Sequence, residues 1–369
     1  MTGLPPFHAD HVGSLLRPAE LARARERSKR GEIDAGALRE VQDRCIRDAV
    51  ARQEAIGLRA ITDGEFRRDW WHIDFLSGLE GVTARPDPGV ARFRDIDASA
   101  MPPIMGVTGR IARAAPVFVE HFRFLKSVSR RTPKMTLPAP ATLHQRGGDA
   151  VIDRSVYPDL GAFWDDVARA YREEIRDLAA AGCRYLQIDD TSYAMLCDAE
   201  FRAMAGRRGD DPSALVRTYA AAINAALAGR PAGMTVTMHT CRGNFMSSWV
   251  GSGSYEAVAE AVFNTVEVDG FFLEYDSERA GGFEPLRFMP RGKKVVLGLV
   301  TTKTPALESR ELLKKRIDEA SRFVPLEQLC LSPQCGFAST HHGNRLGEGD
   351  QWRKLERIVE LAHEVWGDG

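Results

Sequence analysis

Strand-like apolar stretches and amphipathic helix-like stretches alternate along most of the chain, and this order constrains the fold more than any other feature of the sequence. Such alternation is typical of βα units, in which each helix returns the chain so that successive strands run parallel. An extended segment is expected over His8–Ser14, and it is followed by seven clearer strand candidates: Arg59–Asp63, Lys134–Ala139, Arg184–Asp189, Met234–Thr240, Gly270–Tyr275, Lys294–Val300 and Gln328–Ser332. Eight parallel strands with helices between most of them predict an α/β protein with a (β/α)8 TIM barrel.

The helical stretches show the 3.6-residue periodicity of helices that cover a sheet. The segment Leu160–Ala181 places its large apolar residues along one side and stops at Gly182, a residue suited to the end of a helix. Ala37–Ile56 has a similar apolar side, and Gln351–Trp366 is a terminal amphipathic helix that we expect to complete the outer ring. These helices are interpreted as barrel helices in preference to helices that bind a partner.

The segment between residues 64 and 132 does not follow the repeat. It contains an aromatic cluster (Trp70, Trp71 and Phe75) and a turn-rich polar stretch. We interpret residues 64–132 as an insertion after the second strand that folds over the mouth of the barrel as a lid. The absence of internal repeats and low-complexity linkers predicts one catalytic domain over residues 1–369.

The composition excludes several classes of protein. A formal net charge of -1 gives no basic footprint for nucleic acid, and the chain has no apolar run long enough to predict a membrane span. The six cysteines are spread over 369 residues, unlike the dense pattern of a secreted disulfide scaffold. We therefore expect a cytoplasmic protein, in which paired cysteine and histidine more often indicate a metal or catalysis.

Four residues at or just beyond predicted strand ends have side chains that bind metals. His239 and Cys241 are two positions apart, so their side chains point to the same side of a strand. Glu274 ends the next strand, and Cys335 follows the last one. Taken singly, each has a plainer explanation, as a packed or solvated side chain. Because parallel strands of a barrel end at one face, the four together predict a zinc site with N, S, O and S ligands.

At this point the sequence resembles the cobalamin-independent methionine synthases, in their zinc-bearing C-terminal catalytic barrel. The resemblance spans nearly the whole chain, without the duplicated N-terminal barrel of the long members. It is carried by an ordered set of motifs: Gly13-Ser14, Asp63-Gly64-Glu65, Gln187-Ile188-Asp189-Asp190, His239-Thr240-Cys241, Glu274 and Pro333-Gln334-Cys335-Gly336. Each motif is weak alone, but the ordered set is a strong signal for the family. Because the duplicated N-terminal barrel is missing, the chain resembles the shorter, single-barrel members.

The resemblance implies a chemistry for these residues. Zinc converts a bound thiol into a nucleophilic thiolate, and Glu274 is the ligand expected to give up its position to the incoming thiol. Glu65 and Asp189, the latter beside Asp190, are expected to hold the ammonium group of an amino-acid thiol such as homocysteine. The backbone near Gly13 and Ser14 is expected to receive its carboxylate. An ion pair of Glu65 with Arg67 or Arg68, and an ordinary charge pair at the strand end, are the alternatives.

The sequence departs from the family where a proton donor for the leaving group is expected. The family has a D-x-H-S-P segment there, whereas this chain reads Thr301-Thr302-Lys303-Thr304-Pro305. The family's tryptophan in the third-strand loop is also missing from Leu137–His144. Lys303 is our candidate catalytic replacement for the missing acid. His144, His341 and His342 are further candidates, and a surface or packing role explains each of the four equally well.

These observations predict a zinc-dependent methyltransferase that methylates a thiol, with homocysteine giving methionine as the first hypothesis. Its expected partners are a small-molecule thiol and a methyl donor, and the donor is left open among a folate, a corrinoid and a sulfonium compound. The alternative is another zinc-dependent alkyl transfer, such as the joining of an epoxide to a thiol cofactor. A non-catalytic zinc or thiol-binding protein and a related decarboxylase are weaker hypotheses. The sequence leaves the number of subunits open, a homo-oligomer included.

Overall fold

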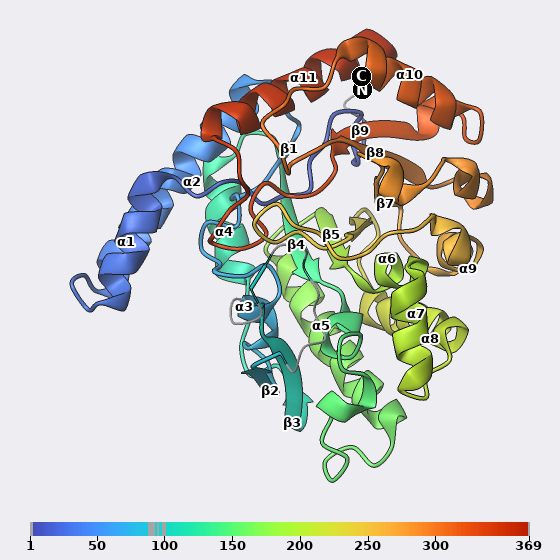
Figure 1. The fold of residues 1–369 in the computed structure, drawn as a ribbon. Coiled ribbons are helices and arrows are strands. Elements are labelled where there is room, and N and C mark those ends of the chain that lie inside the picture. Colours follow the sequence, from blue (N-terminus) through green and yellow to red (C-terminus); the bar gives the residue numbers. More distant parts are fainter. Residues whose placement is uncertain (1–2, 88–92, 94–95, 98–100, 368–369) are drawn as a thin grey trace.

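The computed structural model describes residues 3–87, 93, 96–97 and 101–367. Its centre is one curled sheet of seven parallel strands in the order β1-β4-β5-β6-β7-β8-β9 (Figure 1). The strands are β1 (Ala60–Ile61), β4 (Thr132–Pro138), β5 (Tyr185–Asp190), β6 (Thr235–Thr240), β7 (Gly270–Glu274), β8 (Lys294–Val300) and β9 (Leu329–Pro333). Each overlaps its predicted strand, and the prediction of an α/β fold with a parallel sheet is confirmed.

The expected first strand, His8–Ser14, is reduced to one bridge. Ala9 pairs in parallel with Leu331 of β9, and Asp10 N donates to Leu331 O at 3.0 Å. Beyond this bridge, the His11 ring lies 3.1 Å from Ala60 O of β1. The backbone of Gly13 then turns to φ 137°, which ends the extended conformation. The segment thus contacts both edge strands of the sheet without forming a strand of its own, and the fold is barrel-like, with seven strands in place of the predicted eight.

Helices cover the outside of the curled sheet (Figure 1). The helices that follow the strands or flank the sheet are α2 (Ala35–Ala55), α4 (Val119–Val128), α5 (Leu160–Ala180), α8 (Pro212–Leu227), α9 (Ala259–Thr265), α10 (Arg310–Ser321) and α11 (Glu348–Trp366). Two further helices, α6 (Ser192–Cys197) and α7 (Ala199–Arg207), lie between β5 and α8. None of the helices within the described residues is long and apolar enough to cross a membrane.

Helix α5 shows why these segments are helical. The Asp159 carboxylate accepts from Gly161 N at the start of the helix, and the predicted apolar side is fully buried against the sheet and its neighbours. The helix ends where Gly182 adopts φ 100°, as the sequence predicted. Burial of this side supplies most of the stability of the helix, since isolated helices of this length are marginal in water.

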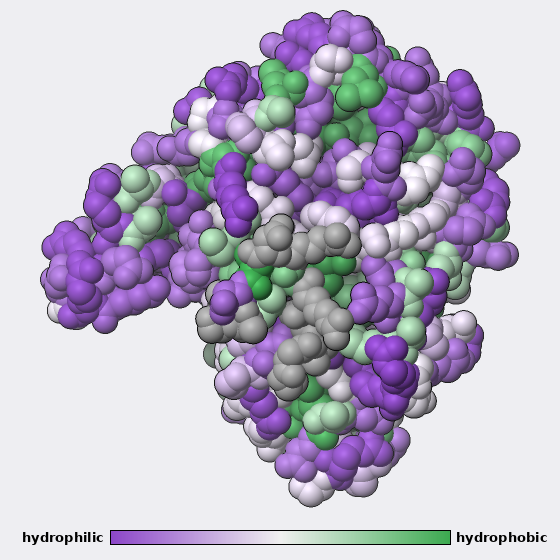
Figure 2. All heavy atoms as spheres, in the orientation of Figure 1, coloured by the Kyte–Doolittle hydropathy of each residue, from purple (hydrophilic) through white to green (hydrophobic). Residues whose placement is uncertain are grey.

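The predicted insertion, residues 64–132, contains several elements and lies partly outside the described residues. They are α3 (Ile73–Leu76), the antiparallel pair β2 (Glu80–Arg85) and β3 (Ile104–Ala112), and α4. Helix α4 packs against α5 and β4 as an outer helix. Helix α1 (Ala19–Lys29) packs against α2 and projects as an arm on the same side of the molecule as α4, and its surface is largely hydrophilic in Figure 2.

Candidate active site

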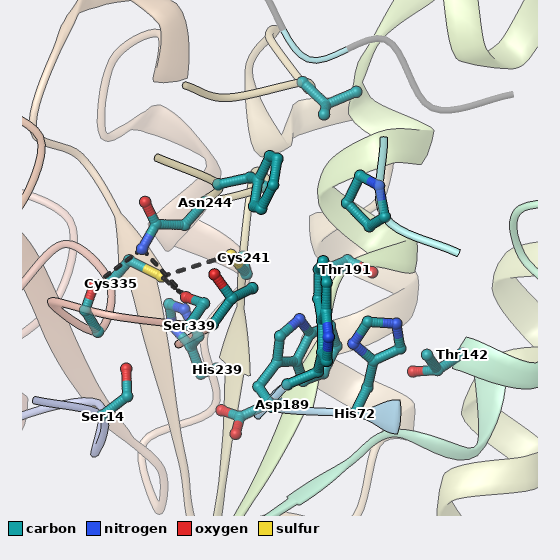
Figure 3. A pocket seen from close by; sticks show the side chains of 18 of the residues that line it. Ser14, His72, Thr142, Asp189, Thr191, His239, Cys241, Asn244, Cys335 and Ser339 are labelled. Carbon is teal, nitrogen blue, oxygen red and sulfur yellow. Dashed lines mark hydrogen bonds between the residues drawn. The ribbon is translucent and has the colours of Figure 1, made fainter. Parts of the chain in front are cut away.

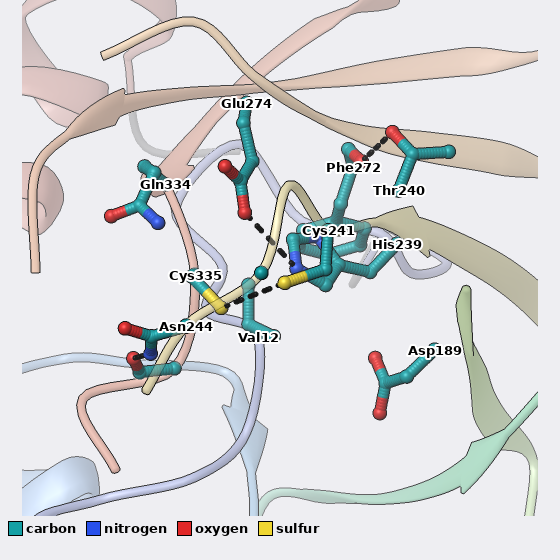
Figure 4. Close-up of polar contacts among 12 residues, drawn as sticks. Val12, Asp189, His239, Thr240, Cys241, Asn244, Phe272, Glu274, Gln334 and Cys335 are labelled. Atoms are coloured by element: carbon teal, nitrogen blue, oxygen red, sulfur yellow. Dashed lines mark hydrogen bonds and ion pairs between the residues drawn. The ribbon is translucent and has the colours of Figure 1, made fainter. Parts of the chain in front are cut away.

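The four predicted metal ligands lie together at the carboxyl ends of the strands. His239 is on β6, Cys241 directly follows this strand, Glu274 ends β7, and Cys335 lies two residues beyond β9. One ligand atom from each side chain lies within 4.8 Å of the others. Cys241 Sγ is 3.5 Å from Cys335 Sγ, and His239 Nε2 is 3.8 Å from Glu274 Oε1 (Figure 4). Both cysteines are free thiols and all four residues are buried.

Backbone packing brings the Cys335 loop close to the sheet. Gln334 N donates to Val300 O of β8 at 2.7 Å. A Cβ atom on Gly298 of β8 would lie 2.8 Å from Gln334 Cα, so only glycine allows this approach. Asn244 then joins the two cysteine-bearing loops, because its Nδ2 donates to Gly336 O at 2.8 Å and to Ser339 Oγ at 3.0 Å. The relative position of the two cysteines is thus fixed by backbone contacts and by one amide side chain.

The chemistry of the four side chains fits a zinc ion. Both ring nitrogens of His239 and Oε1 of Glu274 are buried without a hydrogen-bond partner, which is costly unless a cation lies among them. In the metal-free chain, the hydrogen bond with Cys241 lowers the pKa of the Cys335 thiol well below its ordinary value. Although burial lowers it, the neighbouring Cys335 and Glu274 raise the pKa of His239. Two sulfurs, one imidazole and one carboxylate are a ligand set that suits tetrahedral zinc.

A pocket opens beside the cluster (Figure 3). Of the residues predicted for the site, it is lined by Ser14, Glu65, Asp189, His239, Cys241 and Cys335. The remaining lining includes aromatic and apolar residues, among them Trp70, Trp71, Phe93, Phe201, Phe245 and Met195, together with polar residues such as Gln145 and Arg146. Phe75, which the sequence grouped with the two tryptophans, lies instead in the core, with its ring 5.1 Å from that of Tyr171.

Glu65 and Asp189 are two buried carboxyl groups that face this pocket. Thr136 Oγ1 donates to Glu65 Oε1 at 2.8 Å, and Arg68 Nη1 lies 3.5 Å from the same oxygen. Burial raises the pKa of Glu65, and it raises the pKa of Asp189 to about 7. The Glu65 backbone is in the left-handed region at φ 61°, a conformation that costs a non-glycine residue about 1 kcal/mol. A strained, buried acid that lines a pocket is typical of a binding or catalytic site.

Four other predicted residues do not line the pocket: Glu274, which belongs to the ligand cluster, and Asp190, Gly13 and Lys303. The Asp190 carboxylate accepts from Ser192 Oγ at 2.7 Å and from Tyr193 N at 2.9 Å, and so binds the first turn of α6. Gly13 O accepts from Thr62 Oγ1 at 2.6 Å. Lys303 Nζ donates to Asn244 Oδ1 at 3.1 Å, which connects Lys303 to the two cysteine loops.

The histidines fall into two groups, those that line the pocket and those that do not. All nine lie within the described residues, and two of them line the pocket: His239 and His72. His144 instead lies 2.9 Å from the Tyr219 hydroxyl and 3.1 Å from Asp149. His72 was missed by the sequence analysis, although it directly follows the tryptophan pair of the predicted lid, which was the available signal. Burial, together with the charge of Arg146, lowers the pKa of His72 to about 3, so its ring is neutral at pH 7.

Comparison with known proteins then identifies the family. Residues 7–362 match the sequence model described as the catalytic domain of cobalamin-independent synthase. The chain belongs to this family.

Members of the cobalamin-independent synthase family resemble this chain over its whole length. The uncharacterized protein YxjG of Bacillus subtilis is 46% identical, and the aligned region covers 98% of this chain and 95% of YxjG. The crystal structure of a putative vitamin-B12 independent methionine synthase from Listeria monocytogenes has a TM-score of 0.79 and 40% identity, with all of both chains covered. These proteins are of the short, single-domain type.

A longer relative is also similar. The 5-methyltetrahydropteroyltriglutamate–homocysteine methyltransferase of Mycolicibacterium paratuberculosis is 25% identical, over 98% of this chain but 43% of its own length. The family is one of transferases, and the predicted resemblance to cobalamin-independent methionine synthases is confirmed.

Proposed function

We propose that this protein is a zinc-dependent methyltransferase that methylates the thiol of homocysteine and releases methionine. The observation that carries the proposal is the convergence of His239, Cys241, Glu274 and Cys335 within 4.8 Å, beside a pocket with two buried acids. Membership of the cobalamin-independent synthase family supports the same conclusion. When bound, zinc holds a thiol as its nucleophilic thiolate at neutral pH.

Different residues around the pocket bind the ammonium, carboxylate and thiol groups of the acceptor. Glu65 and Asp189 accept hydrogen bonds from its ammonium group, and each bond to a charged group contributes about 1.5–3 kcal/mol. Ser14 and the backbone at Gly13 receive the carboxylate, and Asp190 keeps β5 and α6 in place behind Asp189. Cys241 and Cys335 would hold the zinc together with His239, and Glu274 would be the exchangeable ligand, because zinc holds a carboxylate less firmly than a thiolate.

The aromatic residues that line the pocket, such as Trp70 and Phe245, would pack against the methyl donor. A donor that leaves as an anion requires a proton, and the segment 301–305 carries no histidine to supply it. Lys303 is the candidate that the sequence analysis proposed. His72 also lines the pocket, but its ring is neutral at pH 7, so it can donate a hydrogen bond to the leaving group and is a poor source of a proton. A sulfonium or corrinoid donor needs no strong acid, so the missing histidine favours such a donor for homocysteine. The alternative function is another zinc-dependent thiol alkyl transfer, such as the joining of an epoxide to a thiol cofactor.

We further propose that residues 1–369 act as one barrel-like catalytic domain and that the segment 64–132 covers the mouth of the pocket. Trp70, Trp71 and His72 support a covering role because they belong to this segment and line the cavity. All six cysteines are free and buried, which supports a reducing compartment such as the cytoplasm.

One experiment tests the proposed function and separates it from the alternative. Zinc-loaded protein is incubated with homocysteine and, separately, with methyltetrahydrofolate, methylcobalamin or S-methylmethionine, and the products are identified by mass spectrometry. We expect methionine with at least one donor, and no methionine after removal of zinc by a chelator. If none of the donors yields methionine while the protein retains one zinc per chain, the homocysteine hypothesis fails and the alternative thiol alkyl transfer takes its place.

A further inference from the structure

The two oxygens of Glu274 have different surroundings. Oε1 is directed at the His239 ring within the ligand cluster and has no hydrogen-bond partner (Figure 4). Oε2 lies 3.2 Å from Arg279 Nη2, on the side away from the cluster. The Glu274 side chain is completely buried, so Arg279 supplies charge compensation that water cannot supply.

Arg279 is itself held firmly. It lies in a short helix, Glu278–Ala280, and its Nη2 also donates to Asp276 Oδ1 at 2.8 Å. Its guanidinium lies 5.2 Å from the centre of the Trp249 ring, and its side chain is 8% exposed. Gly253 N donates to Arg279 O at 2.8 Å, which ties this helix to the loop after β6. A guanidinium fixed in this way gives the Glu274 carboxylate a preferred orientation.

We propose that Arg279 is a positioning residue that makes Glu274 the exchangeable member of the ligand set. By holding Oε2, Arg279 leaves only Oε1 to face the cluster, so Glu274 offers a metal one oxygen instead of two. When a thiol takes the place of Oε1, the released carboxylate keeps its partner in Arg279. Without this partner, exchange would leave the Glu274 carboxylate buried with no opposite charge beside it, which disfavours exchange.

This inference rests on the proposed function, and it makes a specific claim about affinities. Removal of Arg279 weakens the binding of the thiol but does not weaken the binding of zinc, because Glu274 then remains a stronger ligand. A residue with a merely structural role would affect both affinities in the same direction. The two affinities are therefore measured separately.

The test uses the full chain with Arg279→Gln and Arg279→Lys. The dissociation constant of zinc is measured by competition with a chelator. The dissociation constant of homocysteine is measured on cobalt-loaded protein, from the sulfur-to-cobalt absorption that grows when a third sulfur binds. For Arg279→Gln we expect homocysteine affinity to fall at least tenfold, with zinc affinity unchanged or higher. Arg279→Lys keeps the charge but loses the planar contact with two carboxylates, and we expect a smaller fall of at least threefold.

Arg113→Gln is the matched control. Arg113 is also buried and bridges two acids, with contacts of 2.6 Å to Glu174 and 2.8 Å to Asp177, but it does not line the pocket. We expect wild-type affinities for both ligands in this variant. The proposal is overturned if homocysteine affinity in Arg279→Gln stays within twofold of wild type, or if zinc affinity falls along with it. If Arg279→Gln does not fold, the same criteria apply to Arg279→Lys. Wild-type protein that gains no third sulfur overturns the proposed function itself, an outcome distinct from an unaffected variant.

Discussion

Asp189 on β5 and His239 on β6 are paired residues of neighbouring parallel strands, so a pocket-facing acid stands beside a candidate metal ligand. Neighbouring strands are about 4.8 Å apart, a spacing that matches the few bonds between the amino group and the thiol of a short amino acid. The register of the sheet therefore sets the distance between the expected ammonium site and the expected sulfur site.

The Asp189→Asn variant is predicted to lose acceptor affinity and to keep zinc. The asparagine amide carries no charge, so its hydrogen bond with the ammonium group is weaker than that of the carboxylate. The KM for homocysteine should therefore rise roughly 10- to 100-fold. Steady-state kinetics and metal analysis of the same preparation check this. Asp190→Asn is the control on the same strand, and it should lower thermal stability through α6 with little change in KM. Equal effects of the two substitutions on KM would contradict this assignment.

The zinc-free protein is predicted to lose stability as the pH rises through the range in which Asp189 titrates. Burial raises the pKa of Asp189 to about 7, far above its value in an unfolded chain, so the folded state binds more protons between about pH 4 and pH 7. Asp189 should therefore contribute a fall in the free energy of unfolding with rising pH in this window, by at most roughly 1.4 kcal/mol per pH unit, and this contribution should level off above it. Urea unfolding at several pH values measures the slope, which should be smaller in Asp189→Asn.

The cysteines near the pocket are predicted to differ from the other cysteines in their effect on metal content. Cys335→Ser removes a direct ligand and should weaken zinc binding by more than roughly 100-fold, since even the outer partners of metal ligands contribute about 10- to 100-fold. Cys45→Ala, on α2, serves as the control and should retain one zinc per chain. Metal analysis after dialysis against a weak chelator distinguishes the two. A fully zinc-loaded Cys335→Ser protein would exclude the proposed ligand set.

Much of this architecture could be predicted from the sequence, for identifiable physical reasons. Parallel strands covered on both faces are continuous apolar runs, so β8 was located to the residue and the other strands nearly so. The cluster of His239, Cys241, Glu274 and Cys335 followed because parallel strands place their carboxyl ends at one face. The apolar pattern of each strand and the rule that parallel strands end at one face were therefore enough to predict the sheet and the ligand cluster.

Contacts between distant segments could not be predicted in this way. The segment 8–14 forms one bridge in place of a strand because its polar side chains bond to β1 and because Gly13 turns the backbone. Alternation along β5 predicts that the side chains of Asp189 and Asp190 point in opposite directions. Which of the two lines the pocket depends on the segments packed around them, and the sequence pattern does not show this. The contact of Lys303 with Asn244 likewise joins residues 59 positions apart in the sequence.

His72 and Lys303 are predicted to affect different steps of the reaction. His72 lines the pocket with a ring that is neutral at pH 7, so it can donate a hydrogen bond to a leaving group but is a poor source of a proton. His72→Phe should therefore reduce kcat by roughly 10- to 100-fold with a donor that leaves as an anion, and should leave homocysteine affinity unchanged. Lys303 contacts Asn244, which bonds to the Cys335 loop, so Lys303→Met should lower zinc affinity and thermal stability. Parallel measurements of kcat, of the homocysteine dissociation constant and of zinc affinity separate these effects. A Lys303→Met protein with normal zinc affinity but a lost rate would identify Lys303, and not His72, as the source of the proton.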